Sequence, residues 1–238
     1  MAGTYPQGFY DDRRAHTAHA ARVVLGLVFP HLSPARVVDV GCGTGTWLAA
    51  ALELGAAHAE GIEGEWVGPD MLDDRRIAFA ARDLELPFSF ARRFDLALSL
   101  EVAEHLSPAR AGGFVADLVA AAPAVLFSAA VPGQGGVNHV NEQWQSFWAE
   151  RFAAHGHAPY DIVRPAVWAD DAIPAWYRQN VVLYLAEDHP AAGRLPRAKI
   201  ENLDIVHPRF WERANRELAY AGALPESEVL ARRARGEA

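Results

Sequence analysis

The chain has 238 residues, of which 51% are hydrophobic, and its formal net charge is −8. This length fits one α/β domain with additions, and the negative charge argues against a nucleic-acid-binding protein, because such proteins neutralise phosphates with clustered Lys and Arg. A single cysteine, Cys42, excludes an internal disulfide and favours a cytoplasmic location, and no apolar stretch reaches the ~20 residues of a membrane span.

Apolar segments of two kinds alternate along the chain. Short continuous apolar runs are typical of strands that are covered on both faces, whereas apolar residues at three- and four-residue spacing predict helices. This alternation favours parallel βαβ units in a doubly wound α/β fold. Helices are predicted at Thr17–Phe29 (ending before Pro30), Thr46–Leu54, Pro108–Ala122 and Glu142–His155, and strands at Arg36–Val40, Ala59–Ile62, Ile77–Ala80, Phe94–Leu100, Ala124–Ala129, Asp161–Arg164 and Gln179–Ala186.

The first predicted strand runs into a glycine-rich turn, VVDVGCGTG, at Val37–Gly45. Glycines let the backbone turn tightly and approach a ligand, while the following helix directs free N–H groups into the crevice beyond the strand. A dinucleotide site is the obvious rival interpretation. Its fingerprint is G-x-G-x-x-G, whereas the third glycine here comes one residue earlier.

Three carboxylates near this turn favour one kind of nucleotide over another. Asp39 precedes the glycines, Glu63 ends the second strand, and Asp83 follows the third. A pyrophosphate would be repelled by these like charges. S-adenosylmethionine carries no phosphate and offers a sulfonium, an ammonium, two ribose hydroxyls and an adenine amine, all of which suit acids.

Taken together, the glycine turn, Glu63 and the segments ARDLELPF and FDLALSLEVAEHL resemble class I S-adenosylmethionine-dependent methyltransferases. The resemblance covers roughly residues 36–186. It implies a mostly parallel seven-stranded sheet with an antiparallel last strand and a helical C-terminal appendage. We therefore expect residues 1–186 to bind S-adenosylmethionine, with residues 1–30 as a helical lid, and residues 187–238 to form a helical extension.

The resemblance also implies a role for each part of the cofactor site. The glycine loop approaches the methionine part, Glu63 accepts hydrogen bonds from the ribose hydroxyls, and Asp83 lies near the adenine amine. Cys42 is expected to fill space, because methyl transfer needs no covalent enzyme intermediate. The expected cofactor-binding residues are Asp39, Gly41, Cys42, Gly43, Gly45, Glu63, Gly64, Asp83, Leu84, Leu100 and Glu101.

Residues that handle the acceptor's proton are expected just after the fourth and fifth strands, where the crevice opens. His105 and His139 are the leading candidates for a catalytic base, because imidazole titrates near neutral pH. Glu104 is expected to cap or orient. Each histidine also fits a purely structural role.

The spacing E-x-x-E-H resembles that of the ubiquinone-pathway O-methyltransferases and the small-RNA 2′-O-methyltransferases. This resemblance implies that Glu101, Glu104, His105 and His139 gather around a divalent metal, either Mg, Mn or Zn. The same segment is also similar to metal-free members of the superfamily, so both alternatives stay open.

Further candidates lie at the rim of the expected crevice. Phe9, Tyr10 and His19 are candidates for the lid over the cofactor. A cluster of aromatic residues either belongs to the core or walls the acceptor pocket, where a π-face against the sulfonium adds ~0.5–2 kcal/mol. These are Trp144, Trp148, Trp168, Trp176 and Tyr177.

The pattern as a whole predicts a methyltransferase that acts on a hydroxyl of a small-molecule or glycan-type metabolite from bacteria. Methylation of an amine or a carbon is the first alternative, and a non-catalytic cofactor-binding module or a nicotinamide-dependent oxidoreductase are the others. No Asn-Pro-Pro-Tyr run follows the fourth strand, which argues against methylation of nucleobase amines. A monomer and a homodimer fit equally well.

Overall fold

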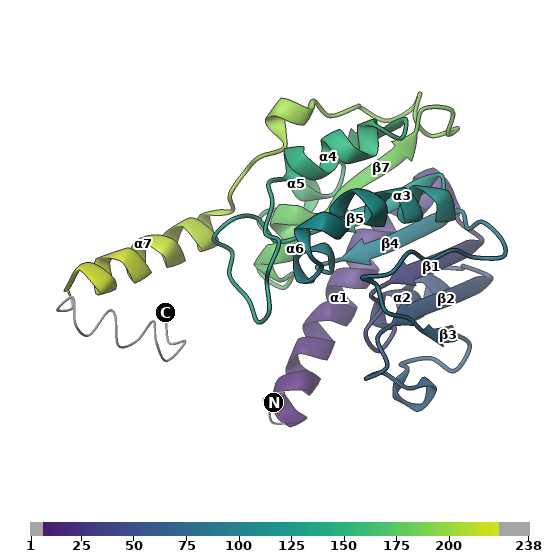
Figure 1. The fold of residues 1–238 in the computed structure, drawn as a ribbon, viewed down its shortest axis with the longest axis horizontal. Coiled ribbons are helices and arrows are strands. Elements are labelled where there is room, and N and C mark those ends of the chain that lie inside the picture. Colours follow the sequence, from purple (N-terminus) through teal and green to yellow (C-terminus); the bar gives the residue numbers. More distant parts are fainter. Residues whose placement is uncertain (1–6, 224–238) are drawn as a thin grey trace. The chain divides into compact units, whose positions relative to one another are not determined.

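A computed structural model describes the backbone of residues 7–223 and the side chains of residues 16–218 and 220. Its centre is a seven-stranded sheet in the order β3-β2-β1-β4-β5-β7-β6 (Figure 1). Neighbouring strands from β3 to β5 run parallel, whereas β7 is antiparallel to β5 and β6. The strands are β1 (Arg36–Val40), β2 (His58–Glu63), β3 (Ala78–Ala81), β4 (Leu96–Leu100), β5 (Ala124–Ser128), β6 (His157–Tyr160) and β7 (Val182–Ala186).

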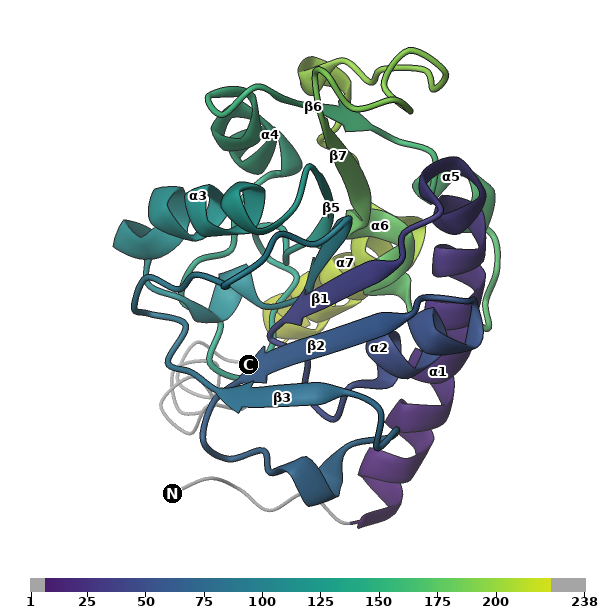
Figure 2. The same ribbon diagram turned by 90° about the vertical axis from the view of Figure 1, so that its right-hand side faces the viewer.

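Helices cover both faces of the sheet, and each face has its own apolar core. The helices α1 (Gln7–Leu32) and α2 (Thr46–Glu53) cover one face, and α3 (Ala111–Ala121) and α4 (Gln145–Ala153) cover the other (Figure 2). Successive residues of β1 serve opposite cores, since Val37 joins the first and Val38 the second. Burial on both faces explains why the central strands β4 and β5 are almost entirely apolar.

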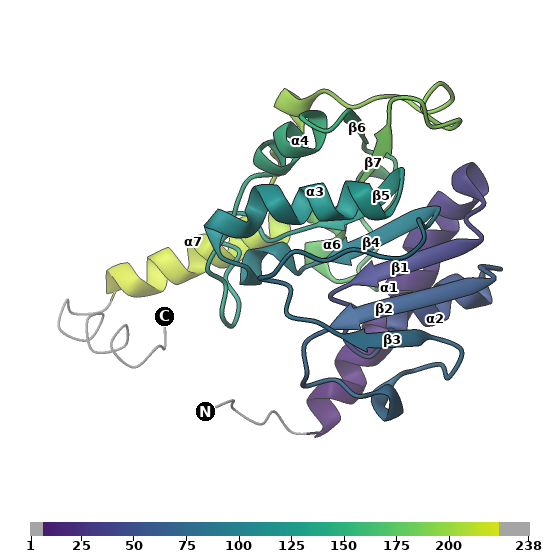
Figure 3. The same cartoon turned by 45° about the vertical axis from the view of Figure 1, so that its right-hand side comes forward.

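The strand order creates a switch point between the central strands β1 and β4. From β1 the chain proceeds outward to β2 and β3, then returns to β4 on the other side of β1 (Figure 3). In open α/β sheets, ligands bind in the crevice beyond the carboxyl ends of strands at such a point. The expected doubly wound sheet with an antiparallel last strand is therefore confirmed.

Two of the predicted strands are misplaced. Residues 161–164 form a turn that leads into α5 (Arg164–Val167), and the edge strand β6 lies just before it. Arg164 donates to both carboxylate oxygens of Asp161, at 2.9 and 2.8 Å, and Pro165 suits the first turn of a helix. Part of the predicted strand from Gln179 belongs instead to α6 (Ala175–Asn180).

The remaining elements are short, apart from one helix near the C-terminal end. Single 3₁₀ turns occur at Pro69–Met71, Ala103–His105, Pro108–Arg110 and Ile200–Asn202. Residues 1–205 form one compact unit and residues 206–238, with α7 (Pro208–Ala223), form a second. Ala191 and Leu203 are buried in the cores of the first unit, and the expected extension of the same domain from residue 187 stays a prediction. Among the described helices, none has the length and apolarity that crossing a membrane requires.

Candidate active site

The glycine turn after β1 is closely packed against the neighbouring loops. Gly41 and Gly45 have φ values of 84° and 80°, which L side chains rarely adopt. A Cβ on Gly41 would lie 2.4 Å from Val102, and one on Gly45 would lie 2.8 Å from Ile77. The sequence GCGTG is therefore dictated both by backbone conformation and by contact with the loops after β4 and before β3.

Glu63 joins the carboxyl ends of β1 and β2. One carboxylate oxygen accepts a hydrogen bond from the amide of Gly43 and the other from the amide of Gly64, both at 2.9 Å. Each oxygen retains a lone pair for a further donor. Glu63 thus shapes the crevice and still has free acceptor capacity.

Asp39 and Cys42 lie beneath the glycine turn. Asp39 is only 2% exposed, and burial, together with the negative charge of Glu63, raises the pKa of its carboxyl well above the ordinary value. Burial likewise raises the pKa of the Cys42 thiol, and the thiol donates to the carbonyl of Gly43. A thiol with a raised pKa is a poor nucleophile.

The segment after β3 carries Asp83 and Leu84. Leu84 is buried while Asp83 is exposed, with its carboxylate accepting a hydrogen bond from the amide of Glu85 at 3.0 Å. Arg110 anchors this segment by donating to the carbonyls of Leu84 and Leu86, at 2.9 and 3.1 Å. No motif singled out Arg110, because its partners are main-chain atoms that are distant in sequence.

Glu101 follows Leu100 at the end of β4, in the left-handed conformation with φ 57°. Its two carboxylate oxygens accept hydrogen bonds from the side-chain amides of Gln134 at 2.9 Å and Asn180 at 3.0 Å. Burial raises the pKa of Glu101, although these hydrogen bonds oppose the rise. The sequence did not reveal Asn180, because it lies at the end of α6, where a strand was predicted.

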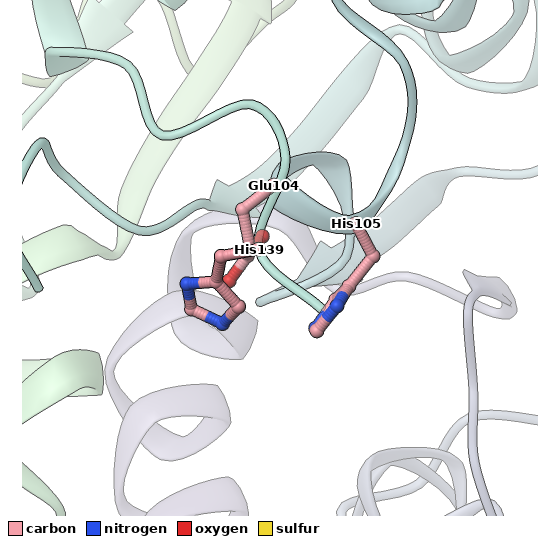
Figure 4. A group of neighbouring side chains, drawn as sticks. All are labelled: Glu104, His105 and His139. Carbon is pink, nitrogen blue, oxygen red and sulfur yellow. The ribbon is translucent and has the colours of Figure 1, made fainter. Parts of the chain in front are cut away.

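Glu104, His105 and His139 come together from the loops that follow β4 and β5. Potential ligand atoms of the three side chains all lie within 4.8 Å of one another, and Figure 4 shows both rings beside the Glu104 carboxylate. The two imidazoles meet edge to face, with ring centroids 4.8 Å apart at 89°. Glu101 does not belong to this group of described residues.

Glu104 is a buried carboxyl with unused oxygens. The residue is 0% exposed, and neither oxygen accepts a hydrogen bond of good geometry from the described residues. Burial, and then the charge of Glu101, raise the pKa of Glu104 well above its ordinary value, and the amides of Glu104 and Ala130 offset this only in part. Such a group needs a proton or a cation.

Main-chain hydrogen bonds hold the two histidine loops in register. The carbonyl of Glu104 accepts hydrogen bonds from the amides of Val140 and Asn141, at 2.9 and 3.0 Å. His139 is thereby placed next to the 3₁₀ turn that carries Glu104 and His105. Burial lowers the pKa of His105, and proximity to His139 lowers it further.

The aromatic candidates divide between the core and the rim. Trp148 is 1% exposed and packs against Phe127 in the second core. Tyr177 is buried against Trp47, with ring centroids 5.2 Å apart, and Trp144 is exposed. His19 lies on α1 opposite Asp170, 4.0 Å away. The side chains of Phe9 and Tyr10 lie outside the described part of the chain.

The sheet order and the acid-lined glycine turn at its switch point define a class I S-adenosylmethionine-dependent methyltransferase. The chain belongs to the family whose model is described as a methyltransferase domain, which matches residues 11–163. The expected fold, enzyme class and cofactor are thereby confirmed. No curated protein matches the chain in a sequence comparison.

Solved structures share this fold at low sequence identity. The S-adenosylmethionine-bound amino pentose methyltransferase CalS10 from Micromonospora echinaspora is 18% identical, with a TM-score of 0.53, over 78% of this chain and 99% of that protein. The magnesium protoporphyrin IX methyltransferase ChlM from Synechocystis PCC 6803 is 16% identical, with a TM-score of 0.54, over 78% and 90%. The [4+2]-cyclase SpnF is 18% identical, with a TM-score of 0.51, over 71% and 82%. Because the reactions in these names differ, the acceptor must be argued from the site.

Proposed function

We propose that the protein transfers a methyl group from S-adenosylmethionine to a hydroxyl of a small-molecule or glycan-type acceptor. The observation that carries this proposal is the convergence of Glu104, His105 and His139, whose potential ligand atoms lie within 4.8 Å of one another. Hydroxyl methylation requires removal of the acceptor's proton, and this group supplies either a base or the ligands of a metal that acidifies the hydroxyl. An amine acceptor would need neither device to the same degree.

The cofactor site in this proposal consists of the residues that surround the crevice. Glu63 accepts hydrogen bonds from the ribose hydroxyls through its remaining lone pairs, and Asp83 and Leu84 border the adenine. The glycine turn, Asp39 and Leu100 surround the methionine part, and Glu101 lies beside it. The bound cofactor supplies an electrophilic methyl carbon on a sulfonium. The carboxylate of Glu63 favours that positive charge and disfavours a phosphate.

A divalent metal fits the Glu104, His105 and His139 group on two observations. Neither oxygen of the buried Glu104 accepts a hydrogen bond of good geometry from the described residues, and a metal ion would satisfy them. The ring of His139 also occupies the position that a Cβ on residue 136 would take. The ring therefore fits in this loop only because residue 136 is glycine. Two imidazoles and one carboxylate favour Zn²⁺ or Mn²⁺ over Mg²⁺, which prefers oxygen ligands.

The role of Glu101 in this arrangement differs from that of Glu104. Gln134 and Asn180 already engage its carboxylate oxygens, so we propose that Glu101 borders the cofactor and that three residues hold the metal. Without a metal, His105 and His139 are both candidates for the base, and burial lowers the pKa of His105, which favours its neutral form.

The experiment measures the release of S-adenosylhomocysteine with hydroxyl and amine acceptors of matched size. The acceptors are a phenol, a sugar alcohol and a primary amine. We expect turnover with a hydroxyl acceptor, and turnover with the amine alone would contradict the proposal. Cofactor binding without turnover on any acceptor in a broad panel would indicate a non-catalytic module. A cytoplasmic, bacterial setting and the lid role of residues 1–30 remain predictions.

The metal is tested separately by titrating the chelated protein with Zn²⁺ in a calorimeter. We expect one site in the wild type, and a loss of affinity in Glu104→Gln and His105→Asn. His155→Gln, an exposed histidine far along the chain, serves as the control. Full activity in the presence of chelator, together with no bound Zn²⁺, would show that His105 or His139 acts as a metal-free base.

A further inference from the structure

We infer that Glu142 is a positioning residue that fixes the orientation of His139. This inference deepens the proposed function, since it concerns one of the three residues of that site. A carboxylate oxygen of Glu142 lies 2.9 Å from Nδ1 of His139. Glu142 does not belong to the group that surrounds the candidate metal position, so it acts through His139.

Glu142 also holds the loop that carries His139. Its carboxylate accepts hydrogen bonds from the amides of Gly133 at 2.8 Å and Gly135 at 2.7 Å. One side chain therefore binds three donors from a single loop, two on the main chain and one on the imidazole. Charge-assisted hydrogen bonds of this kind are about twice as strong as neutral ones, so the loop and the ring are fixed together.

Gly136 restrains the opposite side of the same ring. A Cβ on Gly136 would lie 2.2 Å from Nε2 of His139 and 2.4 and 2.7 Å from Cε1 and Cδ2. The ring of His139 therefore lies directly against the main chain of Gly136. Together with the edge-to-face contact from His105, Glu142 and Gly136 leave the imidazole a single orientation.

This arrangement determines which nitrogen is available for chemistry. A carboxylate can only accept, so in the neutral imidazole Nδ1 carries the hydrogen and Nε2 keeps its lone pair. A lone pair on Nε2 is required whether His139 binds a metal or accepts a proton. Carboxylates that orient metal-binding histidines in this way typically contribute 10–100-fold in affinity or activity.

The test measures the tautomer of His139 directly, by long-range proton–nitrogen correlation in ¹⁵N-labelled protein at about pH 8, above the ordinary imidazole pKa. His139→Gln assigns the signal. We expect the Nδ1–H tautomer in the wild type and a shift towards Nε2–H in Glu142→Gln, because a side-chain amide can donate to Nδ1. Glu150→Gln on α4 changes the net charge equally and is expected to leave the tautomer unchanged.

Two further readouts separate positioning from general damage. Zn²⁺ affinity and kcat are expected to fall about 10–100-fold in Glu142→Gln, with little change in KM for S-adenosylmethionine. Gly136→Ala displaces the ring without changing charge, and we expect it to reproduce the loss of Zn²⁺ affinity while the far-ultraviolet circular dichroism stays that of the wild type.

The inference would be overturned if Glu142→Gln and Gly136→Ala both folded and kept the wild-type tautomer and kcat. The tautomer is measured without metal, cofactor or acceptor. Absence of Zn²⁺ binding or of methyl transfer in the wild type would therefore contradict the proposed function, while the tautomer alone would still decide the role of Glu142.

Discussion

The carboxylate of Glu63, at the end of β2, accepts a hydrogen bond from the amide of Gly43 at 2.9 Å, in the turn after β1. This bond joins the two loops that meet at the switch point of the sheet. It places a negative charge where the glycine turn exposes its main chain. We expect this charge to favour S-adenosylmethionine over a phosphate-bearing nucleotide.

Glu63→Gln keeps the size of the side chain but removes its charge. We expect the affinity for S-adenosylmethionine to fall about 10–100-fold, since hydrogen bonds to charged groups contribute ~1.5–3 kcal/mol each. Isothermal titration calorimetry measures the change. Glu65→Gln, two residues along and exposed, is the matched control, and an equal loss of affinity in both variants would refute a specific role for Glu63.

Gly61, in the middle of β2, leaves no room for a side chain. A Cβ there would lie 2.6 Å from the sulfur of Cys42 and 3.0 Å from Leu48. We expect Gly61→Ala to lower the free energy of unfolding by roughly 1–3 kcal/mol through overpacking, with partial recovery in the double variant with Cys42→Ala. Urea denaturation measures both.

The same substitution at Gly26 in α1 provides the contrast to Gly61. No atom lies within 4 Å of a Cβ built on Gly26, and Gly26→Ala is expected to stabilise the helix by ~0.5–1 kcal/mol. An equal change in the free energy of unfolding for Gly61→Ala and Gly26→Ala would contradict the close packing of the Cys42 sulfur against Gly61.

Asp39 makes stability depend on pH in an identifiable direction. Because its pKa is raised in the folded protein, ionisation opposes folding, and the cost grows as pH rises from the ordinary value towards the folded pKa. Asp39→Asn is therefore expected to melt at a higher temperature than the wild type, with a larger difference at about pH 8 than at about pH 4. A difference that narrowed as pH rose would contradict the burial of an uncompensated Asp39.

Arg110 supports the segment with Asp83 and Leu84 without belonging to the crevice itself. It forms a buried ion pair with Asp117 in addition to its two bonds to main-chain carbonyls. Arg110→Met retains the aliphatic stem but leaves Asp117 unpaired. We expect a loss of about 3–5 kcal/mol in unfolding free energy, together with weaker cofactor binding. Arg92→Met, at an exposed position, is expected to change neither.

The sequence was sufficient to predict the sheet but not its far edge. The strands β4 and β5 are apolar except for one serine each, because helices cover both faces, and such runs identify buried strands directly. By contrast, β6 (HAPY) contains proline and histidine, so its pattern is weak. The predicted strand therefore falls on the neighbouring residues 161–164, whose middle two are Ile162 and Val163. In the structure the ion pair between Asp161 and Arg164 belongs to the turn before α5.

The site was predictable where it depends on motifs, and not where it depends on distant contacts. Their positions just after the predicted fourth and fifth strands made Glu104, His105 and His139 candidates, and only the family resemblance implied that they gather around a metal. The amides that engage Glu101 come from Gln134 and Asn180, which are separated from it by 33 and 79 residues. Residue pairs so far apart in the sequence leave no local pattern. The sequence therefore contains no sign that two side-chain amides engage Glu101, and Glu101 is a candidate metal ligand on sequence grounds.

Calorimetric titration of the protein with S-adenosylmethionine, S-adenosylhomocysteine and NAD tests the central claim most directly. The crevice should bind the first two at one site and give no heat with NAD, because Glu63 and Asp83 repel a pyrophosphate. Binding of NAD without binding of either sulfur nucleoside would contradict the account.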